Sequence, residues 1–334
     1  LNHVFLHWVR TGRPFIAVAG TDQLALYHVE QARVVKTWPF RHSCLAGLAP
    51  LPGGRELLAA YENGIVGCWD LETGSFRISW SEYACEPFAL AVAREGGAAA
   101  CGGQNRRDWS GLVQLRKLPE GTLLGELRGL RRAVTAVTFI PGRREVAVGT
   151  GDGSLFLWDS GGQTGRPLTG HLHMITVLRC LPDGRRLVSG SRDGTVRVWN
   201  LAQGTELLSL SGHAGGVETL ALTEDGSGIL TAGKDGTLRQ WDLETGRLIR
   251  TGPTDPTDRI ASLLPIPGQR RMLAVTVRGK LLSLPIPDLT GQESSRELLA
   301  KAWPDLRKAL ASVSWPEFRS WLLSGAAYLV EEEP

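Results

Sequence analysis

Hydrophobic and polar residues alternate along short stretches of the chain, and turn-forming residues separate one stretch from the next. The segment TVRVWN (195–200) alternates in the manner of a half-buried strand. Between Met174 and Gly212, four apolar stretches are separated by Pro-Asp-Gly, Arg-Asp-Gly and Ala-Gln-Gly, each of which is typical of a tight turn. This part of the chain is therefore predicted to form four short antiparallel strands.

The four-strand pattern recurs about every 42 residues. The segment SGSRDGTVRVWN (189–200) returns as TAGKDGTLRQWD (231–242), and Trp158 precedes Trp199 by 41 residues. Extending this period in both directions places further marker positions near residues 27, 69, 115 and 283, which makes seven units. Four strands repeated at this interval are the signature of a β-propeller, whose blades bury both sheet faces only by stacking in a ring.

We therefore predict an all-β, seven-bladed propeller over residues 1–291, followed by a short helical tail over 292–334. Capping boxes at Ser294 with Glu297 and at Ser314 with Glu317 indicate the helices. The seventh blade shows three clear strands, and its closing strand is expected from residues that precede Leu1, from AYLVE (327–331), or from a larger array of propellers. The blades are expected at about 1–40, 41–81, 82–129, 130–170, 171–212, 213–253 and 254–291.

The repeats resemble those of the WD-repeat β-propeller family over roughly residues 1–290. The resemblance rests on two Gly-His dipeptides, each followed by a Trp-Asn or Trp-Asp, and on two further Trp-Asp pairs. These are Gly170-His171 with Trp199-Asn200, Gly212-His213 with Trp241-Asp242, then Trp69-Asp70 and Trp158-Asp159. In this family a His, a Ser or Thr, an Asp and a Trp form a hydrogen-bonded ladder within a blade. The resemblance thus implies a structural role for two sets of four residues: His171, Ser189, Asp193 and Trp199, and His213, Thr231, Asp235 and Trp241.

Composition excludes several classes of protein. The net charge of +3 is too small to indicate nucleic-acid binding by itself. No apolar run is long enough for a membrane span, so no membrane partner is expected. The five cysteines form no C-x-x-C pair, and an odd number fits a reducing compartment better than a disulfide framework. A cytoplasmic location is therefore expected.

The sequence offers no convincing catalytic site, so we expect no enzyme activity, no cofactor and no metal. There is no G-x-S-x-G motif, and the Gly-rich segments VAGTDQ and VGTGDGS precede strands rather than the helix that a phosphate cradle needs. His3 with His7 and His171 with His173 are the only histidine clusters. The ladder accounts for His171 better than metal binding does. A propeller enzyme with a metal in its channel is the remaining enzymatic alternative.

A binding surface is the best remaining interpretation. In the family, one propeller face is formed by the loops that enter each blade and by the turns between its second and third strands. By alignment these turns carry Thr21, Glu62, Arg106 with Arg107, Gly151, Arg192, Lys234 and Arg278. Since blades five to seven are neighbours, Arg192, Lys234 and Arg278 are expected to form a contiguous basic arc. Such an arc attracts acidic or phosphorylated segments.

The third blade adds a longer turn, CGGQNRRDWSG (101–111), which places Arg106, Arg107 and Trp109 at a loop tip. Arginine and tryptophan are common interface anchors. We therefore expect a non-catalytic protein–protein interaction module, a scaffold or sensor that can form part of a longer chain with neighbouring domains as further partners. The alternative is a nucleic-acid-binding propeller that uses the same basic face and stacks bases on Trp109.

Overall fold

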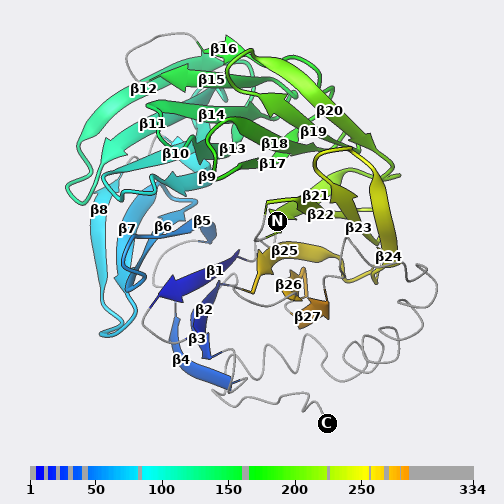
Figure 1. Cartoon of the computed structure of the whole chain (residues 1–334). Coiled ribbons are helices and arrows are strands. Elements are labelled where there is room, and N and C mark those ends of the chain that lie inside the picture. Colours follow the sequence, from blue (N-terminus) through cyan, green and yellow to red (C-terminus); the bar gives the residue numbers. More distant parts are fainter. Residues whose placement is uncertain are drawn as a thin grey trace.

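The computed structural model describes residues 5–10, 14–19, 23–28, 33–39, 44–81, 85–159, 165–223, 226–255, 257–266, 271–278 and 280–285. Every regular element among them is a β-strand. The strands form seven antiparallel sheets arranged as a ring, with the chain passing from one sheet to the next around it (Figure 1). The predicted all-β, seven-bladed propeller is confirmed. The predicted helical tail at 292–334 lies outside the described residues.

Each blade is built from strands that pair in chain order, from the innermost strand outward. Blade one contains β1 (Phe5–Arg10), β2 (Pro14–Ala19), β3 (Gln23–His28) and β4 (Arg33–Pro39). Blade two contains β5 (Leu45–Pro50), β6 (Glu56–Tyr61), β7 (Ile65–Asp70) and β8 (Phe76–Ser81). Blade three contains β9 (Cys85–Val92), β10 (Ala98–Asn105), β11 (Gly111–Lys117) and β12 (Leu123–Leu130). Blade four contains β13 (Val134–Phe139), β14 (Glu145–Thr150), β15 (Leu155–Asp159) and β16 (Arg166–Pro167).

The remaining blades follow the same order. Blade five contains β17 (Ile175–Cys180), β18 (Arg186–Ser191), β19 (Thr195–Asn200) and β20 (Thr205–Ser211). Blade six contains β21 (Val217–Leu222), β22 (Gly228–Gly233), β23 (Thr237–Asp242) and β24 (Leu248–Pro253). Blade seven contains three described strands, β25 (Ile260–Pro265), β26 (Arg271–Thr276) and β27 (Leu281–Pro285). The segment AYLVE lies outside the described residues, so its proposed role as a closing strand stays a prediction.

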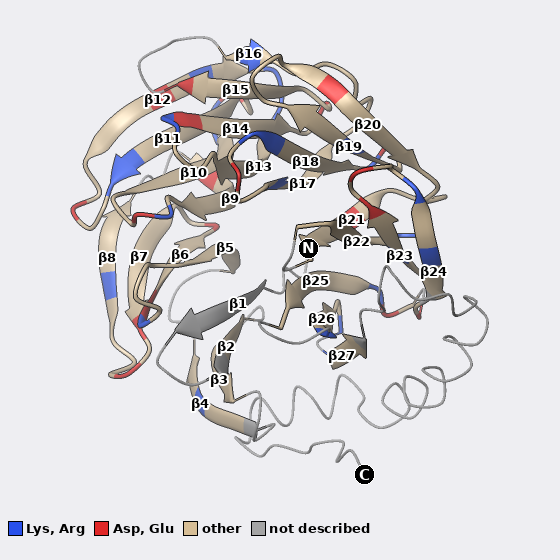
Figure 2. Cartoon of the chain, viewed as in Figure 1, with Lys and Arg blue, Asp and Glu red and all other residues tan. Residues whose placement is uncertain are grey.

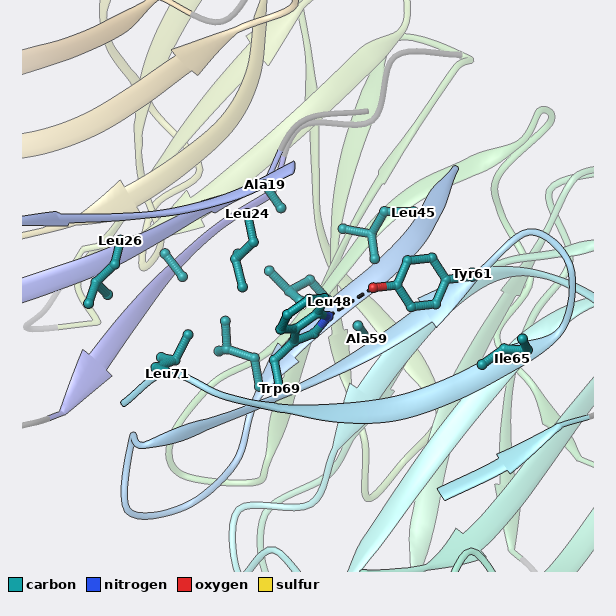
Figure 3. Packing of buried hydrophobic residues seen from close by; sticks show 12 residues of the cluster. Ala19, Leu24, Leu26, Leu45, Leu48, Ala59, Tyr61, Ile65, Trp69 and Leu71 are labelled. Carbon is teal, nitrogen blue, oxygen red and sulfur yellow. Dashed lines mark hydrogen bonds between the residues drawn. The ribbon is translucent and has the colours of Figure 1, made fainter. Parts of the chain in front are cut away.

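Among the described residues, the hydrophobic core is divided into seven clusters, and each cluster joins two consecutive blades. The cluster between blades one and two, for example, combines Leu24 and Leu26 with Leu48 and Trp69 (Figure 3). A blade with two apolar faces therefore buries both of them only when it has a neighbour on each side. Burial of this apolar surface is the main favourable term in folding.

Blades one and seven close the ring through side-chain packing. Their shared cluster brings Ile16, Val18 and Tyr27 of blade one against Leu273 and Val275 of blade seven. Strand β1 is the innermost strand of blade one and pairs with β2. Within the described part of the chain, closure therefore depends on packing between the two blades rather than on a strand shared by them.

Strand register shows which residue holds the tryptophan position in each blade. In blade five, Trp199 lies opposite Leu187 of the second strand. The residue with the same pairing is Arg116 in blade three and Leu284 in blade seven, one residue beyond the positions that the 42-residue period indicates. Arg116 lies over the ring of Trp80, 5.5 Å from its centroid. A cation thus covers an aromatic ring here, in a favourable arrangement.

Hydrogen bonds also join consecutive blades near the centre of the ring. The Thr135 hydroxyl donates to the Ile175 carbonyl at 2.6 Å, and the Thr176 hydroxyl donates to the Val217 carbonyl at 2.8 Å. Because both threonines occupy the second position of an innermost strand, the same contact repeats at two successive blade interfaces.

Glycine at one position of the second strand lets adjacent blades approach closely. A Cβ at Gly190 would lie 2.9 Å from methyl carbons of both Val177 and Val217. Gly102 and Gly149 occupy similar places against Val134 and Ile175 of the next blade. A side chain at any of these positions would push two blades apart, so close packing requires glycine there.

We predict that Gly190→Ala lowers the free energy of unfolding by about 1–3 kcal/mol, because the added methyl group overpacks the interface between blades five and six. Gly97→Ala is the matched control, since a Cβ there meets nothing within 4 Å. Urea denaturation measures both. Equal stability of the two variants would contradict the proposed packing constraint.

Candidate functional site

Four residues of blade five meet in a hydrogen-bonded ladder. The Trp199 indole N–H donates to Ser189 Oγ at 2.8 Å. Ser189 Oγ lies 2.7 Å from Nε2 of His171, and Nδ1 of the same ring lies 2.8 Å from Asp193 Oδ2. The structure thus brings together all four residues that the resemblance implied, and it places them inside the blade.

The protonation states in this ladder follow from burial and hydrogen bonding. Burial lowers the pKa of His171 more than the hydrogen bond to Asp193 raises it, so the imidazole is neutral at pH 7. Burial would raise the pKa of Asp193, but hydrogen bonds from Thr195 and Leu172 outweigh it and hold the pKa at about 2. The ionised Asp193 accepts from Nδ1–H, so Nε2 accepts from the Ser189 hydroxyl.

Blade six repeats the ladder with a threonine hydroxyl. The Trp241 indole N–H donates to Thr231 Oγ1 at 2.9 Å, and that oxygen lies 2.8 Å from His213 Nε2. Both carboxylate oxygens of Asp235 lie 3.1 Å from His213 Nδ1. Thr231 is completely buried. A reactive site needs access to a substrate, so this arrangement fits a structural role.

In blade two, the buried tryptophan N–H has a hydrogen-bond partner that the repeat pattern does not indicate. Trp69 donates its indole N–H to the hydroxyl of Tyr61 at 2.8 Å (Figure 3). The position of Ser189 is occupied by Ala59, and Tyr61 stands two residues further along the same strand. Burial raises the pKa of Tyr61 to about 12, so its hydroxyl stays protonated.

Blade seven replaces the histidine–aspartate contact with an ion pair. Lys280 Nζ lies 3.5 Å from Oδ2 of Asp258, whose side chain is fully buried. Arg278 stands in the turn where blades five and six have the ladder aspartates, and its backbone N–H donates to Asp258 Oδ1 at 2.9 Å.

A repeated backbone hydrogen bond aligns the turns between second and third strands on one face of the ring. In each case a turn residue donates its N–H to the carbonyl that precedes the innermost strand. The pairs are Glu62 to Cys44, Gly151 to Ala133, Arg192 to Met174, Lys234 to Gly216 and Val277 to Arg259, at 2.8–2.9 Å. Thr21 lies outside the described residues. We call this side of the ring the turn face.

The predicted basic arc is only partly assembled as expected. Arg192 and Lys234 lie on either side of a glycine pair, because a Cβ at Gly216 would meet Arg192 and one at Gly215 would meet Lys234. In blade seven the equivalent residue is Val277 and not Arg278. Arg278 is exposed one residue further along, so the third cation stands at a different place in its turn.

Acidic side chains offset part of the positive charge of this arc. Lys234 Nζ lies 3.5 Å from Glu218 Oε1, and Lys280, beside Arg278, pairs with Asp258. Arg192, by contrast, makes no ion pair within the described residues. Figure 2 shows acidic and basic segments interspersed over the turns and outer strands, while the innermost strands carry few charges.

The long turn of blade three places its three predicted residues on the same face. Arg106, Arg107 and Trp109 are all exposed, and 64% of the Trp109 surface is accessible. Arg106 donates a guanidinium N–H to the backbone carbonyl of Glu62. This contact ties the turn of blade three to that of blade two.

Two further arginines that sequence reasoning missed lie beside this turn. Arg131 and Arg132 are exposed in the loop that enters blade four. A Cβ at Gly111, directly after the turn, would lie 2.0 Å from the Arg132 carbonyl oxygen. Their position just before an innermost strand was the available signal, because that position belongs to the turn face in every blade with the repeated hydrogen bond.

The opposite face has a cavity between blades three and four. Its volume is about 390 Å³, and its walls include Leu115, Leu124 and Phe139, with Arg94 and Arg144 among the polar residues. Within the described residues, no group of three or more His, Cys, Asp or Glu side chains could hold a metal ion. His171 faces Ser189 and Asp193, whereas His173 is exposed.

We predict that Ser189→Ala lowers the free energy of unfolding by about 1–3 kcal/mol. The substitution leaves the buried indole N–H of Trp199 and Nε2 of His171 without their partner. Ser209→Ala, on the exposed outer strand of the same blade, is the control and is expected to change stability by less than about 0.5 kcal/mol. Thermal and urea unfolding measure both, and a neutral Ser189→Ala would argue against the ladder.

We also predict that acidification destabilises the protein in two stages. Folding depresses the pKa values of His171 and His213 below 6.5. The unfolded chain therefore binds more protons, and stability falls as the pH drops below about 6.5. Asp193 and Asp235 add a second loss below about pH 4, since their folded pKa values are also depressed.

The free energy of unfolding, measured between pH 7.5 and 5, tests the first stage. The double variant His171→Gln with His213→Gln is expected to show a shallower decline than the wild-type chain. An equally steep decline in this variant would show that other groups cause the pH dependence.

Comparison with known families gives an independent view of the repeats. The family model of the WD40 repeat, described as WD domain, G-beta repeat, matches residues 121–159, 162–200 and 204–242. Each match spans the outermost strand of one blade and the first three strands of the next. No curated protein matches the chain. These three matches, together with the seven-bladed ring, make the chain similar to WD-repeat β-propellers and consistent with that family.

Proposed function

We propose that the chain is a non-catalytic protein–protein interaction module, a scaffold or sensor that recognises an acidic or phosphorylated segment of another protein. WD40 propellers generally act as interaction scaffolds and are generally not catalysts. The observation that carries the proposal is the turn face itself. Five turns are fixed to the ring by the same backbone hydrogen bond, and those of blades five to seven carry Arg192, Lys234 and Arg278. Binding residues are typically found on such loops.

The chemistry of the arc suits carboxylate and phosphate groups. Arg192 presents a planar guanidinium that can donate two parallel hydrogen bonds to either anion. Gly215 and Gly216 lie between Arg192 and Lys234, and the absence of side chains there lets a peptide backbone approach closely. Lys234 and Arg278 add long-range attraction for an acidic ligand.

The five cysteines support the proposed cytoplasmic location. No disulfide joins these cysteines within the described residues, and Cys68, Cys85 and Cys101 are buried. Buried cysteines outside disulfides are characteristic of a reducing compartment. Within the described residues, no helix is long and apolar enough to cross a membrane. Neighbouring domains of a longer chain are further partners that a rigid ring of this kind can hold.

We predict that the intact chain captures a protein from native lysate and that the variant Arg192→Glu with Lys234→Glu and Arg278→Glu loses it. Charge reversal on the turn face repels an acidic segment. The captured protein is identified by mass spectrometry, purified, and its dissociation constant measured for both forms, after melting curves show that both are folded.

The matched control carries Arg94→Glu with Arg144→Glu and Arg185→Glu, three exposed arginines in turns of the opposite face. It is expected to bind as the wild-type chain does. Loss of binding in this control alone would move recognition to the opposite face. Capture of nucleic acid with steep salt dependence and little sequence preference would instead favour the nucleic-acid alternative.

A further inference from the structure

The long turn of blade three has the backbone of a glycine turn but carries a tryptophan. The Trp109 N–H donates to the Asn105 carbonyl at 2.9 Å, four residues back. Four other turns make the same hydrogen bond at 2.8–3.0 Å, and each has glycine at the donor position with a φ of 72°: Gly74, Gly121, Gly204 and Gly246. Trp109 has a φ of 60°, and it is the only described non-glycine residue with positive φ.

This conformation is unfavourable for a bulky side chain. The left-handed region brings Cβ close to the following backbone, so glycine adopts it freely and other residues do so at a cost. Burial does not compensate for this cost, since the side chain is largely exposed, with 64% of the residue surface accessible. The tryptophan therefore makes the fold less stable than glycine would, and residues that break a local rule in this way cluster at functional sites.

Four arginines lie in the Trp109 turn and in the loop beside it, and three of them are without an ion pair in the described part of the chain. Arg107, Arg131 and Arg132 are exposed and make no ion pair within the described residues. Arg106 adds a fourth cation, held by the Glu62 carbonyl. Asp108 is the acidic residue of the turn, and its Oδ1 accepts hydrogen bonds from the backbone N–H and the hydroxyl of Ser110.

The position of the two loop arginines is fixed by close backbone contact. Gly111 pairs with Leu130, and only a residue without Cβ leaves room for the Arg132 carbonyl beside it. The Arg131 and Arg132 loop is thereby held against the end of the Trp109 turn. Arg106, Arg107, Trp109, Arg131 and Arg132 form one surface, which we call the blade-three patch.

We propose that the blade-three patch is the principal docking site for an acidic segment of a partner protein, with an apolar side chain of that segment against the Trp109 indole. The proposal rests on the proposed function and names the place and the chemistry of recognition. Exposed aromatic and arginine side chains are the usual hot spots of protein interfaces. The patch has more unpaired cations than the basic arc, where Glu218 pairs with Lys234. The confinement of the patch to one turn and one loop suits a short segment better than an extended nucleic acid.

Two substitutions at one position separate the binding role from the structural cost. Trp109→Gly removes the indole and the strain, whereas Trp109→Ala removes the indole and keeps Cβ in the left-handed region. Trp109→Gly is expected to raise the melting temperature by roughly 2 °C, and Trp109→Ala is expected to leave it lower than that of the glycine variant. Both variants are expected to lose binding to the same extent.

Binding is measured by fluorescence anisotropy with a labelled peptide (Glu-Glu-Leu)₄, its neutral counterpart (Gln-Gln-Leu)₄ and the single-stranded DNA dT12. The wild-type chain is expected to bind the acidic peptide, more weakly at 200 mM than at 50 mM NaCl, and to bind the neutral peptide at least about tenfold more weakly. Both Trp109 variants and Arg131→Glu with Arg132→Glu are expected to lose at least about tenfold in affinity. Leu207→Ala, an exposed leucine on the outer strand of blade five, is the control with unchanged affinity.

Several results would overturn the proposal: no binding of the acidic peptide by the wild-type chain, unchanged affinity in the Trp109 variants, or a Trp109→Gly chain that is less stable than wild type. Stronger binding of dT12 than of the acidic peptide would assign the patch to nucleic acid. The failure of this inference is distinct from that of the proposed function. If the captured partner protein still binds the Trp109 and Arg131/Arg132 variants but not the arc variant, the interaction function stands and its centre lies on blades five to seven.

Discussion

The burial of each blade against its two neighbours is the constraint on which the rest of the structure depends. Seven apolar clusters hold the ring together, one at each blade interface. The tryptophan position contributes to the interface with the preceding blade, as Trp69, Trp199 and Trp241 show. No single blade can bury both faces alone, so closure between blades seven and one matters as much as the fold of any blade.

The hydrogen-bonded ladders vary from blade to blade, whereas every blade interface has an apolar cluster. Complete His–Ser/Thr–Asp–Trp ladders occur in blades five and six, while Tyr61 serves Trp69 in blade two. Blade seven uses the Lys280–Asp258 ion pair at the corresponding turn. Several kinds of polar contact can therefore satisfy the buried groups, because the requirement is a partner for each donor and acceptor rather than one particular set of residues. This freedom explains why the outer repeats diverge in sequence while the ring is preserved.

The fold could be predicted because its causes are local and repeated. Strand alternation, Asp-Gly turns and the spacing of Trp158, Trp199 and Trp241 can all be read from the sequence alone. The sequence does not indicate the side-chain partners in the less regular blades. Tyr61 stands two residues away from the position that the repeat indicates, and Glu218 meets Lys234 through the pairing of β21 with β22 within blade six. Arg131 and Arg132 reach the Trp109 turn because β12 pairs with β11 and leaves them beside Gly111. Nothing in the sequence indicates the left-handed backbone of Trp109.

The proposed function places the binding surface on the turn face, where Trp109 is exposed in a left-handed backbone conformation. Hydrogen exchange of the chain, alone and with its captured partner, tests this claim most directly. The account predicts slower exchange on binding in residues 105–110 and 130–133, with weaker protection at 192–194 and 234–236. Protection confined to the turns of the opposite face, around 93–97 and 140–144, would contradict it.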